Sequence, residues 1–276
     1  MSKRLIQALA GALIATAMFA APSSAAMDAA TEAALKQALA GSHRSDANKA
    51  RDQYRHPLET LKFLGLNKNM KVMEIWPANG WYTEVLAPVL KDNYIAAHFD
   101  PARNENMKKA IDAYKADLAK NEAVYGKPTV AVLFPASNQM TPVPAGSLDM
   151  VLTFRNIHNW MASDSQDAMF KVFYDSLKPG GYLGVVEHRA NTDKPQDPKA
   201  ASGYVREDAA QAMAEKAGFK LVSKSDSNNN AKDTKDYPKG VWTLPPNYRE
   251  GDVDKTKYTA IGESDRFTQL YQKPAM

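Results

Sequence analysis

The chain of 276 residues carries 35 Lys and Arg side chains against 31 Asp and Glu side chains, a balance that gives no reason to expect nucleic acid as a partner. It contains no cysteine, which excludes disulfide bonds, a thiolate nucleophile and a cysteine-ligated metal within this chain. The length is sufficient for one large domain with its own hydrophobic core, with or without appendages.

Residues 1–26 have the pattern of an export signal. Lys3 and Arg4 form a basic start, an apolar run extends from Leu5 to Ala21, and the small residues of PSSAAM offer a cleavage site. No later stretch is long and apolar enough to span a bilayer. We therefore expect a soluble protein that is periplasmic or secreted, with no membrane anchor after cleavage.

Residues 27–66 are expected to form a helical extension before the main domain. Residues 28–41 have helical spacing of Ala and Leu and end at a glycine, and residues 58–66 are amphipathic. The segment between them is rich in polar and basic side chains. We interpret it as a solvated helical face, with a lid for an anionic ligand as the alternative; its candidate residues are His43, Arg44, Arg51, Tyr54, Arg55 and His56.

From residue 67 onward, strand and helix patterns alternate, which is typical of a mostly parallel sheet with helices on both faces. The predicted helices are 81–90, 104–126, 165–181 and 206–219. The predicted strands are 71–76, 93–99, 128–134, 147–154, 182–188, 220–226 and 266–274. The sequence therefore predicts one α/β domain over residues 67–276 with a seven-stranded sheet.

The connection before the last strand, residues 227–265, is unusually long. It opens with a polar run and then contains Trp242 and Tyr248, which indicate that part of it packs against the domain. Connections of this length are uncommon in compact domains, and many of them are functional. We expect a lid or a covering strap.

The segment VMEIWPANGWYTEVLAP, residues 72–88, is a strand that turns into a helix. In an open α/β sheet, ligands bind beyond the carboxyl ends of the strands, close to the reversal of strand order. The loop after the first strand is therefore the first place to look for a ligand site. Glycines in such a loop allow a ligand to approach the backbone closely.

Here the sequence resembles the class I S-adenosylmethionine-dependent methyltransferases. Their first motif is an acidic residue, an aliphatic residue and Gly-x-Gly-x-Gly, followed by Thr. On that frame Glu74 is the acidic residue, Trp76 and Ala78 stand at the first two glycine positions, Gly80 is the third glycine and Thr83 matches the Thr.

The resemblance covers roughly residues 58–226 and the last strand. It continues in SLDMVLTF with Asp149, in YDSLKPGGYLGVVEH and in AGFKLV. The order of these segments is more specific than any one of them. It implies a Rossmann-like methyltransferase sheet and S-adenosylmethionine as the methyl donor.

The resemblance also implies where the donor lies. Its methionine end would lie across Glu74–Gly80. The acidic residue that holds the ribose in the family falls on His98, with Asp100 two residues later, and Asn138 after the third strand could bind the adenine.

Two clusters of polar residues follow the fourth and fifth strands, at the same edge of the sheet. In FRNIHNW we expect His158 to be the general base, because imidazole titrates near neutral pH, and Arg155 to hold an anionic group. The predicted substrate-binding residues are Arg155, Asn156, Trp160, Glu187, His188 and Arg189. The alternative is structural: Trp160 packs the next helix and His158 caps it.

His98, His158, Glu187 and His188 could together bind zinc, iron or manganese. The chain has no HxH or HExxH spacing among them, so we interpret them as strand-end residues that bond one another and assign no metal ligand.

The sequence thus predicts a methyltransferase that uses S-adenosylmethionine and acts on a small molecule. A periplasmic ligand-binding protein without catalysis is one alternative, which Trp76, Ala78 and the export signal favour. A metal-dependent enzyme on the same scaffold is another. Nothing resembles a P-loop or a GxSxG motif.

Overall fold

The computed structural model describes residues 27–134, 139–141 and 143–275. The predicted export signal, residues 1–26, and Asn138 lie outside the described residues. None of the helices within the described ranges is long and apolar enough to cross a membrane.

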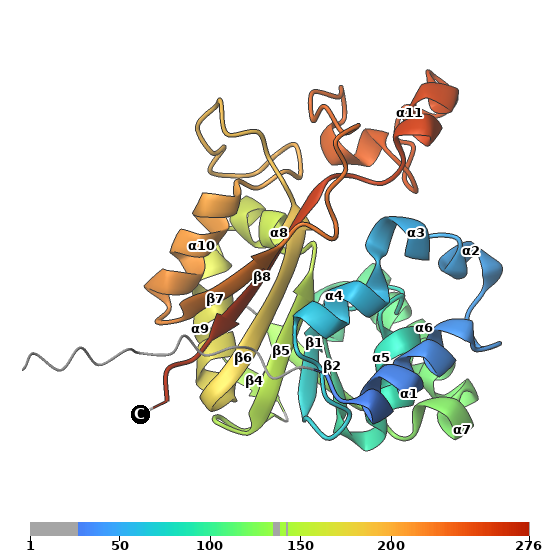
Figure 1. Cartoon of the computed structure of the whole chain (residues 1–276), viewed down its shortest axis with the longest axis vertical. Helices are drawn as coiled ribbons and strands as arrows, with labels where there is room; N and C mark the ends of the chain where they lie inside the picture. Colours follow the sequence, from blue (N-terminus) through green and yellow to red (C-terminus); the bar gives the residue numbers. More distant parts are fainter. Residues whose placement is uncertain (1–26, 135–138, 142, 276) are drawn as a thin grey trace, which may run out of the picture.

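The domain is built on one mixed sheet, as the sequence predicts (Figure 1). The order is β4-β3-β2-β1-β5-β6-β8-β7, in which β4 and β8 run antiparallel to their neighbours. The strands are β1 (Val72–Ile75), β2 (Tyr94–His98), β3 (Thr129–Phe134), β4 (Gln139–Thr141), β5 (Leu148–Phe154), β6 (Leu177–His188), β7 (Lys220–Ser225) and β8 (Arg266–Gln272). All seven predicted strands are present, and the three-residue edge strand β4 is an addition.

Helices cover both faces of the sheet (Figure 1). Those of the N-terminal extension are α1 (Ala29–Ala40), α2 (Asp46–Lys49), α3 (Asp52–Arg55) and α4 (Pro57–Phe63). The others are α5 (Thr83–Leu90), α6 (Glu105–Lys120), α7 (Glu122–Tyr125), α8 (Ile157–Ala162), α9 (Gln166–Ser176), α10 (Glu207–Lys216) and α11 (Lys255–Ile261). Pro88 does not end α5, which continues to Leu90.

Alternation along the strands divides the core into two hydrophobic clusters. Met73 and Ile75 of β1 belong to the cluster that contains Phe170 and Phe173 of α9. Val72, their neighbour in the same strand, belongs to the cluster with side chains of α1, α4, α5 and α6. The N-terminal helices therefore bury their apolar side chains against the same face as α5 and α6.

Two predicted helix boundaries are wrong. The helix predicted over 165–181 ends at Ser176, because Leu177 already pairs with Leu148 as the first residue of β6. The helix predicted over 104–126 is interrupted at Asn121, whose backbone angles (φ −103°, ψ 17°) leave the helical region, so α6 and α7 are separate.

The long connection between β7 and β8 lies beyond the carboxyl ends of the parallel strands and includes α11 (Figure 1). Buried polar groups fix it to the domain. The Tyr204 hydroxyl donates its proton to the Asp233 carboxylate, whose two oxygens lie 3.0 and 3.1 Å away, and Asp233 also accepts from the Asp265 backbone N–H at 2.8 Å. The segment is thus an anchored roof above the sheet.

Candidate active site

The loop after β1 keeps the backbone of a glycine-rich loop although two of its glycine positions hold other residues. The φ angles of Trp76, Ala78 and Gly80 are +47°, +53° and +80°. A side chain in this left-handed region costs roughly 1–2 kcal/mol, a strain that is found mainly at functional sites. Left-handed residues that alternate with Pro77 and Asn79 are typical of ligand-binding loops.

Glu74, at the end of β1, is joined to a chain of hydroxyl groups. The Tyr94 hydroxyl donates to Glu74 Oε2 over 2.5 Å, and Thr83 Oγ1 lies 2.9 Å from the hydroxyls of both Tyr94 and Tyr114. Burial raises the pKa of Glu74 to about 7, against the hydrogen bond from Tyr94, which lowers it. Near neutral pH the protonated and ionised forms of the Glu74 carboxyl group are therefore both populated.

His98 and Asp100 make local backbone contacts. His98 Nδ1 accepts from the Phe99 N–H at 2.9 Å, so the proton lies on Nε2, which is 3.3 Å from the Ala78 carbonyl oxygen. Burial lowers the pKa of His98, so this ring is neutral. Asp100 Oδ1 accepts from the Ala102 N–H at 2.8 Å. His98 thus holds the β1 loop.

A cavity of about 240 Å³ lies where β1, β5 and β6 end, beneath the roof. This volume is below the roughly 300–1,000 Å³ of most small-molecule pockets. The cavity is lined by Arg55, Glu74, Trp76, Pro77, Ala78, Trp81, Tyr82, Phe99, Phe154, Arg155, Asn156, His158, Asn159, His188, Val241, Trp242, Pro245, Pro246, Asn247, Ser264 and Arg266.

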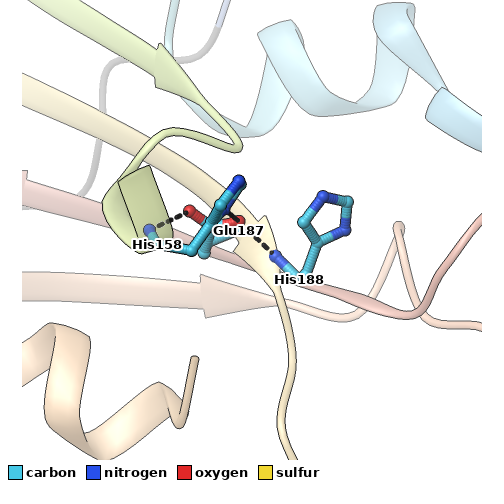
Figure 2. Close-up of side chains that lie close together, drawn as sticks. All are labelled: His158, Glu187 and His188. Carbon is cyan, nitrogen blue, oxygen red and sulfur yellow. Dashed lines mark hydrogen bonds and ion pairs between the residues drawn. The ribbon is translucent and has the colours of Figure 1, made fainter. Parts of the chain in front are cut away.

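His158, which lines this cavity, forms a buried pair with Glu187 behind it (Figure 2). Glu187, which is 0% exposed, accepts from His158 Nδ1 at 3.1 Å and from the backbone N–H groups of His158 and His188 at 3.3 and 2.8 Å. Because Nδ1 donates to the carboxylate, Nε2 of His158 is the nitrogen left to accept a proton.

His188 lies beside this pair, with ring centroids 5.5 Å apart, and its Nδ1 bonds Ser264 Oγ. Burial, then the neighbouring His158 and Arg266, lower the pKa of His188, so its ring is neutral. The neutral ring of His188 and the ring of His158 both line the cavity.

The predicted substrate-binding residues divide into two groups. Arg155, Asn156 and His188 line the cavity with His158, and the Asn156 amide donates to the Ile75 carbonyl oxygen over 2.9 Å, which ties the ends of β5 and β1 together. The other predicted residues, Trp160, Glu187 and Arg189, do not line it.

Trp160 is 0% exposed and packs against Phe173 and Trp76, with ring centroids 5.3 and 6.0 Å apart. Arg189 bonds Asn229 Oδ1 over 2.6 Å outside the cavity. Of the predicted donor-binding residues, Glu74, Trp76 and Ala78 line the cavity, whereas Gly80, Thr83, His98 and Asp100 do not.

Sequence reasoning missed the aromatic wall and Arg266, and it offered Arg55 only under the alternative of a lid for an anionic ligand. Trp81, Tyr82, Phe99 and Phe154 line the cavity, and Arg55 and Arg266 join Arg155. The interpretation of residues 42–57 as a solvated face is wrong for Arg44 and Arg55, each only 2% exposed. Their guanidinium groups lie 5.3 and 4.4 Å from the Trp81 ring, and each is also paired with a carboxylate, Arg44 with Asp52 and Arg55 with Glu263. The sequence signal that could have indicated buried arginines here is the high proportion of Arg in residues 42–57.

Potential ligand atoms of His158, Glu187 and His188 lie within 4.8 Å of one another, whereas His98 is not part of this group. These atoms already bond within the protein, and Arg266, Arg155 and Arg55 are close enough to lower the pKa of His188. A cation at this place would be repelled by the same three arginines. The charges therefore weigh against a metal-dependent site.

Comparison with known proteins identifies the fold. No protein-family model matches the chain, and no curated protein matches it. Solved structures do: an S-adenosylmethionine-dependent methyltransferase from Aquifex aeolicus (16% identity, 81% of this chain and 93% of the other, TM-score 0.54) and the cyclase SpnF (13%, 89% and 93%, TM-score 0.57). A third is a Galdieria sulphuraria protein described as a sarcosine dimethylglycine methyltransferase (12%, 82% and 86%, TM-score 0.53). The chain has the Rossmann-like fold of class I methyltransferases.

The strain in the β1 loop predicts an unusual response to glycine. Replacing Ala78 with Gly should leave the free energy of unfolding unchanged or raise it by up to about 1 kcal/mol, because relief of the left-handed strain offsets the greater chain entropy of glycine. The control Ala87→Gly, inside α5, should lower it by about 1 kcal/mol. Urea unfolding of both variants measures this, and equal losses would show that Ala78 is unstrained.

Proposed function

We propose that the protein is an S-adenosylmethionine-dependent methyltransferase that acts on a small molecule. The observation that carries the proposal is the single cavity that joins Glu74 and the left-handed β1 loop to the His158–Glu187 pair. The fold supports it, because the Aquifex aeolicus and Galdieria sulphuraria proteins are methyltransferases by name. The name of the latter includes small-molecule acceptors.

The residues around the β1 loop fit a methyl donor at its methionine end but differ from the family pattern at the ribose. Glu74, Trp76 and Ala78 would hold the donor, since they line the cavity and the loop backbone retains the ligand-binding form. The side chains of Trp76 and Phe99, with ring centroids 4.8 Å apart, offer aromatic surface next to a sulfonium. Asp100 does not line the cavity, so the ribose would be bound differently from the family pattern.

The chain's own residues would act mainly by position. The bound donor supplies a methyl group already activated on a sulfonium sulfur. His158 Nε2 would take the proton of the acceptor's nucleophile, and Glu187 would fix the ring and stabilise its positive charge. Trp242 and the neighbouring prolines of the roof would exclude water.

A second candidate is a protein that binds a small anion without catalysis. The packing of Trp76 on Phe99 favours it, because these rings narrow the loop side of a cavity of only about 240 Å³. The proposed export of the protein also favours it, since the methyl donor is made in the cytoplasm.

Calorimetric titration of the purified protein with S-adenosylhomocysteine and S-adenosylmethionine separates the two. A methyltransferase should bind both with a dissociation constant near micromolar, about −8 kcal/mol. Glu74→Gln should weaken this binding, because it removes the carboxylate but keeps the shape and the Tyr94 contact. Glu105→Gln, exposed on α6, is the matched control. Absence of heat at millimolar ligand would exclude the methyltransferase proposal.

A further inference from the structure

Four arginines from three distant parts of the chain meet at one side of the cavity. Arg51 and Arg55 flank α3, Arg155 follows β5 and Arg266 begins β8. Three of them, Arg55, Arg155 and Arg266, line the cavity. A small void of about 10 Å³ between the same three side chains is about large enough for one water molecule.

A single carboxylate, Glu263, lies among them. Arg51 Nε donates to its Oε1 over 2.6 Å and Arg55 Nε to its Oε2 over 3.1 Å, while Arg266 Nη2 also contacts Oε2. Burial alone raises the pKa of Glu263, but the arginines, Arg266 first, outweigh this and hold it well below its ordinary value.

Much of the donor capacity of the arginines is unused. Arg55 is 2% exposed, yet its Nη1 and Nη2 are buried without a hydrogen-bond partner, as is Arg266 Nε. The Arg155 guanidinium has no side-chain hydrogen bond or ion pair among the residues that the structure describes. Buried N–H donors without partners are costly, and Arg155 has no carboxylate partner among the described residues, so this arrangement calls for an anionic group that accepts hydrogen bonds.

The other carboxylates nearby do not supply one. Glu187 already accepts three N–H hydrogen bonds, and Glu74 accepts from Tyr94 and is half protonated near pH 7. Burial, and then Arg266, lower the pKa of Arg155 to about 10, which still leaves it charged at neutral pH. Glu263 offsets one of the three guanidinium charges of Arg55, Arg155 and Arg266, and Glu74 offsets part of another, so this side of the cavity keeps an excess of positive charge.

We propose that Arg55, Arg155 and Arg266 bind a carboxylate or phosphate group of a small molecule, so that the acceptor is an anion. Guanidinium groups bind both kinds of group through paired hydrogen bonds. The methyl donor has a sulfonium and an ammonium group against one carboxylate, so as a whole it adds positive charge and leaves the excess charge of the arginines in place. That the bound anion is a methyl acceptor rests on the proposed function, whereas the anion site itself does not.

The first test is titration with inorganic phosphate at constant ionic strength, with sodium chloride as the blank. Arg155→Gln is the test variant because the Arg155 guanidinium has no hydrogen bond or ion pair to lose among the described residues, and Arg103→Gln, exposed beyond β2, removes the same charge elsewhere. The wild type should bind phosphate. The affinity of Arg155→Gln for phosphate should be at least tenfold lower, and that of Arg103→Gln should stay within twofold of the wild type. Absence of phosphate binding to the wild type, or equal binding by both variants, overturns the proposal.

The second test identifies what the arginines hold. If phosphate and S-adenosylhomocysteine bind together, the site is separate from the donor and takes the acceptor's anionic group, as proposed. If they exclude each other, and Arg155→Gln weakens S-adenosylhomocysteine but not methylthioadenosine, the arginines hold the donor's carboxylate and the anionic acceptor is overturned. If phosphate binds through Arg155 but S-adenosylhomocysteine does not bind, the anion site stands and the methyltransferase proposal fails.

Discussion

Replacing Glu263 with Gln is expected to lower the free energy of unfolding by about 3–5 kcal/mol, the usual cost of removing one partner from a buried ion pair. Glu263 is 2% exposed and is the shared partner of Arg51, Arg55 and Arg266. Without it, these buried guanidinium groups repel one another with no compensating charge. Urea unfolding at neutral pH measures the loss.

The control is Glu122→Gln, which breaks the exposed contact to Lys127 and should cost at most about 1 kcal/mol. Because the folded-state pKa of Glu263 lies below its ordinary value of 4.5, its stabilising contribution is complete above pH 4.5 and declines as the pH falls toward the folded-state pKa. The difference between Glu263→Gln and wild type should therefore narrow in acid. Equal stability at pH 7 would show that solvent already compensates the arginines.

Replacing His158 with Asn is expected to reduce methyl transfer about 100- to 10,000-fold, the usual contribution of a general base. The amide nitrogen of Asn can take the place of Nδ1 and keep the hydrogen bond to Glu187, so the variant loses only Nε2. The assay follows label from S-adenosylmethionine into a small anionic acceptor found by screening.

Binding of S-adenosylhomocysteine should stay within twofold in this variant, since the expected loss lies in the chemical step. His43→Asn provides the control, because His43 contacts the Glu84 carbonyl oxygen and does not line the cavity. Turnover by His158→Asn at the wild-type rate would show that another residue is the general base, and Glu74, with its pKa of about 7, is the next candidate.

The fold was predictable because its signals are local. Apolar runs separated by helical segments mark the strands and predict a mostly parallel sheet, whereas the antiparallel direction of the last strand is seen only in the structure. β4 has only three residues and no pattern of its own. The end of α9 was missed because Leu177 pairs with Leu148, a contact between residues far apart in the sequence.

The site was predictable only where it follows the strand ends. Glu74, Arg155, His158 and His188 lie on or just beyond parallel strands that end at one edge, so their convergence follows from topology. The Glu263 pairing with Arg51 joins residues 212 positions apart, and no local pattern announces it. Trp160 was assigned to the substrate because it follows His158 closely, but the turns of α8 direct it into the core.

The roof has a consequence for how this protein can change over generations. It leaves the sheet at Ser225 and returns beside it, where Ser225 pairs with Thr268. In the statistics of chain closure, doubling the length of such a loop costs only about 0.6 kcal/mol. The length of its unanchored stretches can therefore change at little cost to the sheet. Yet the same loop supplies Glu263, so a deletion that removes this carboxylate leaves Arg51, Arg55 and Arg266 without their shared ion-pair partner.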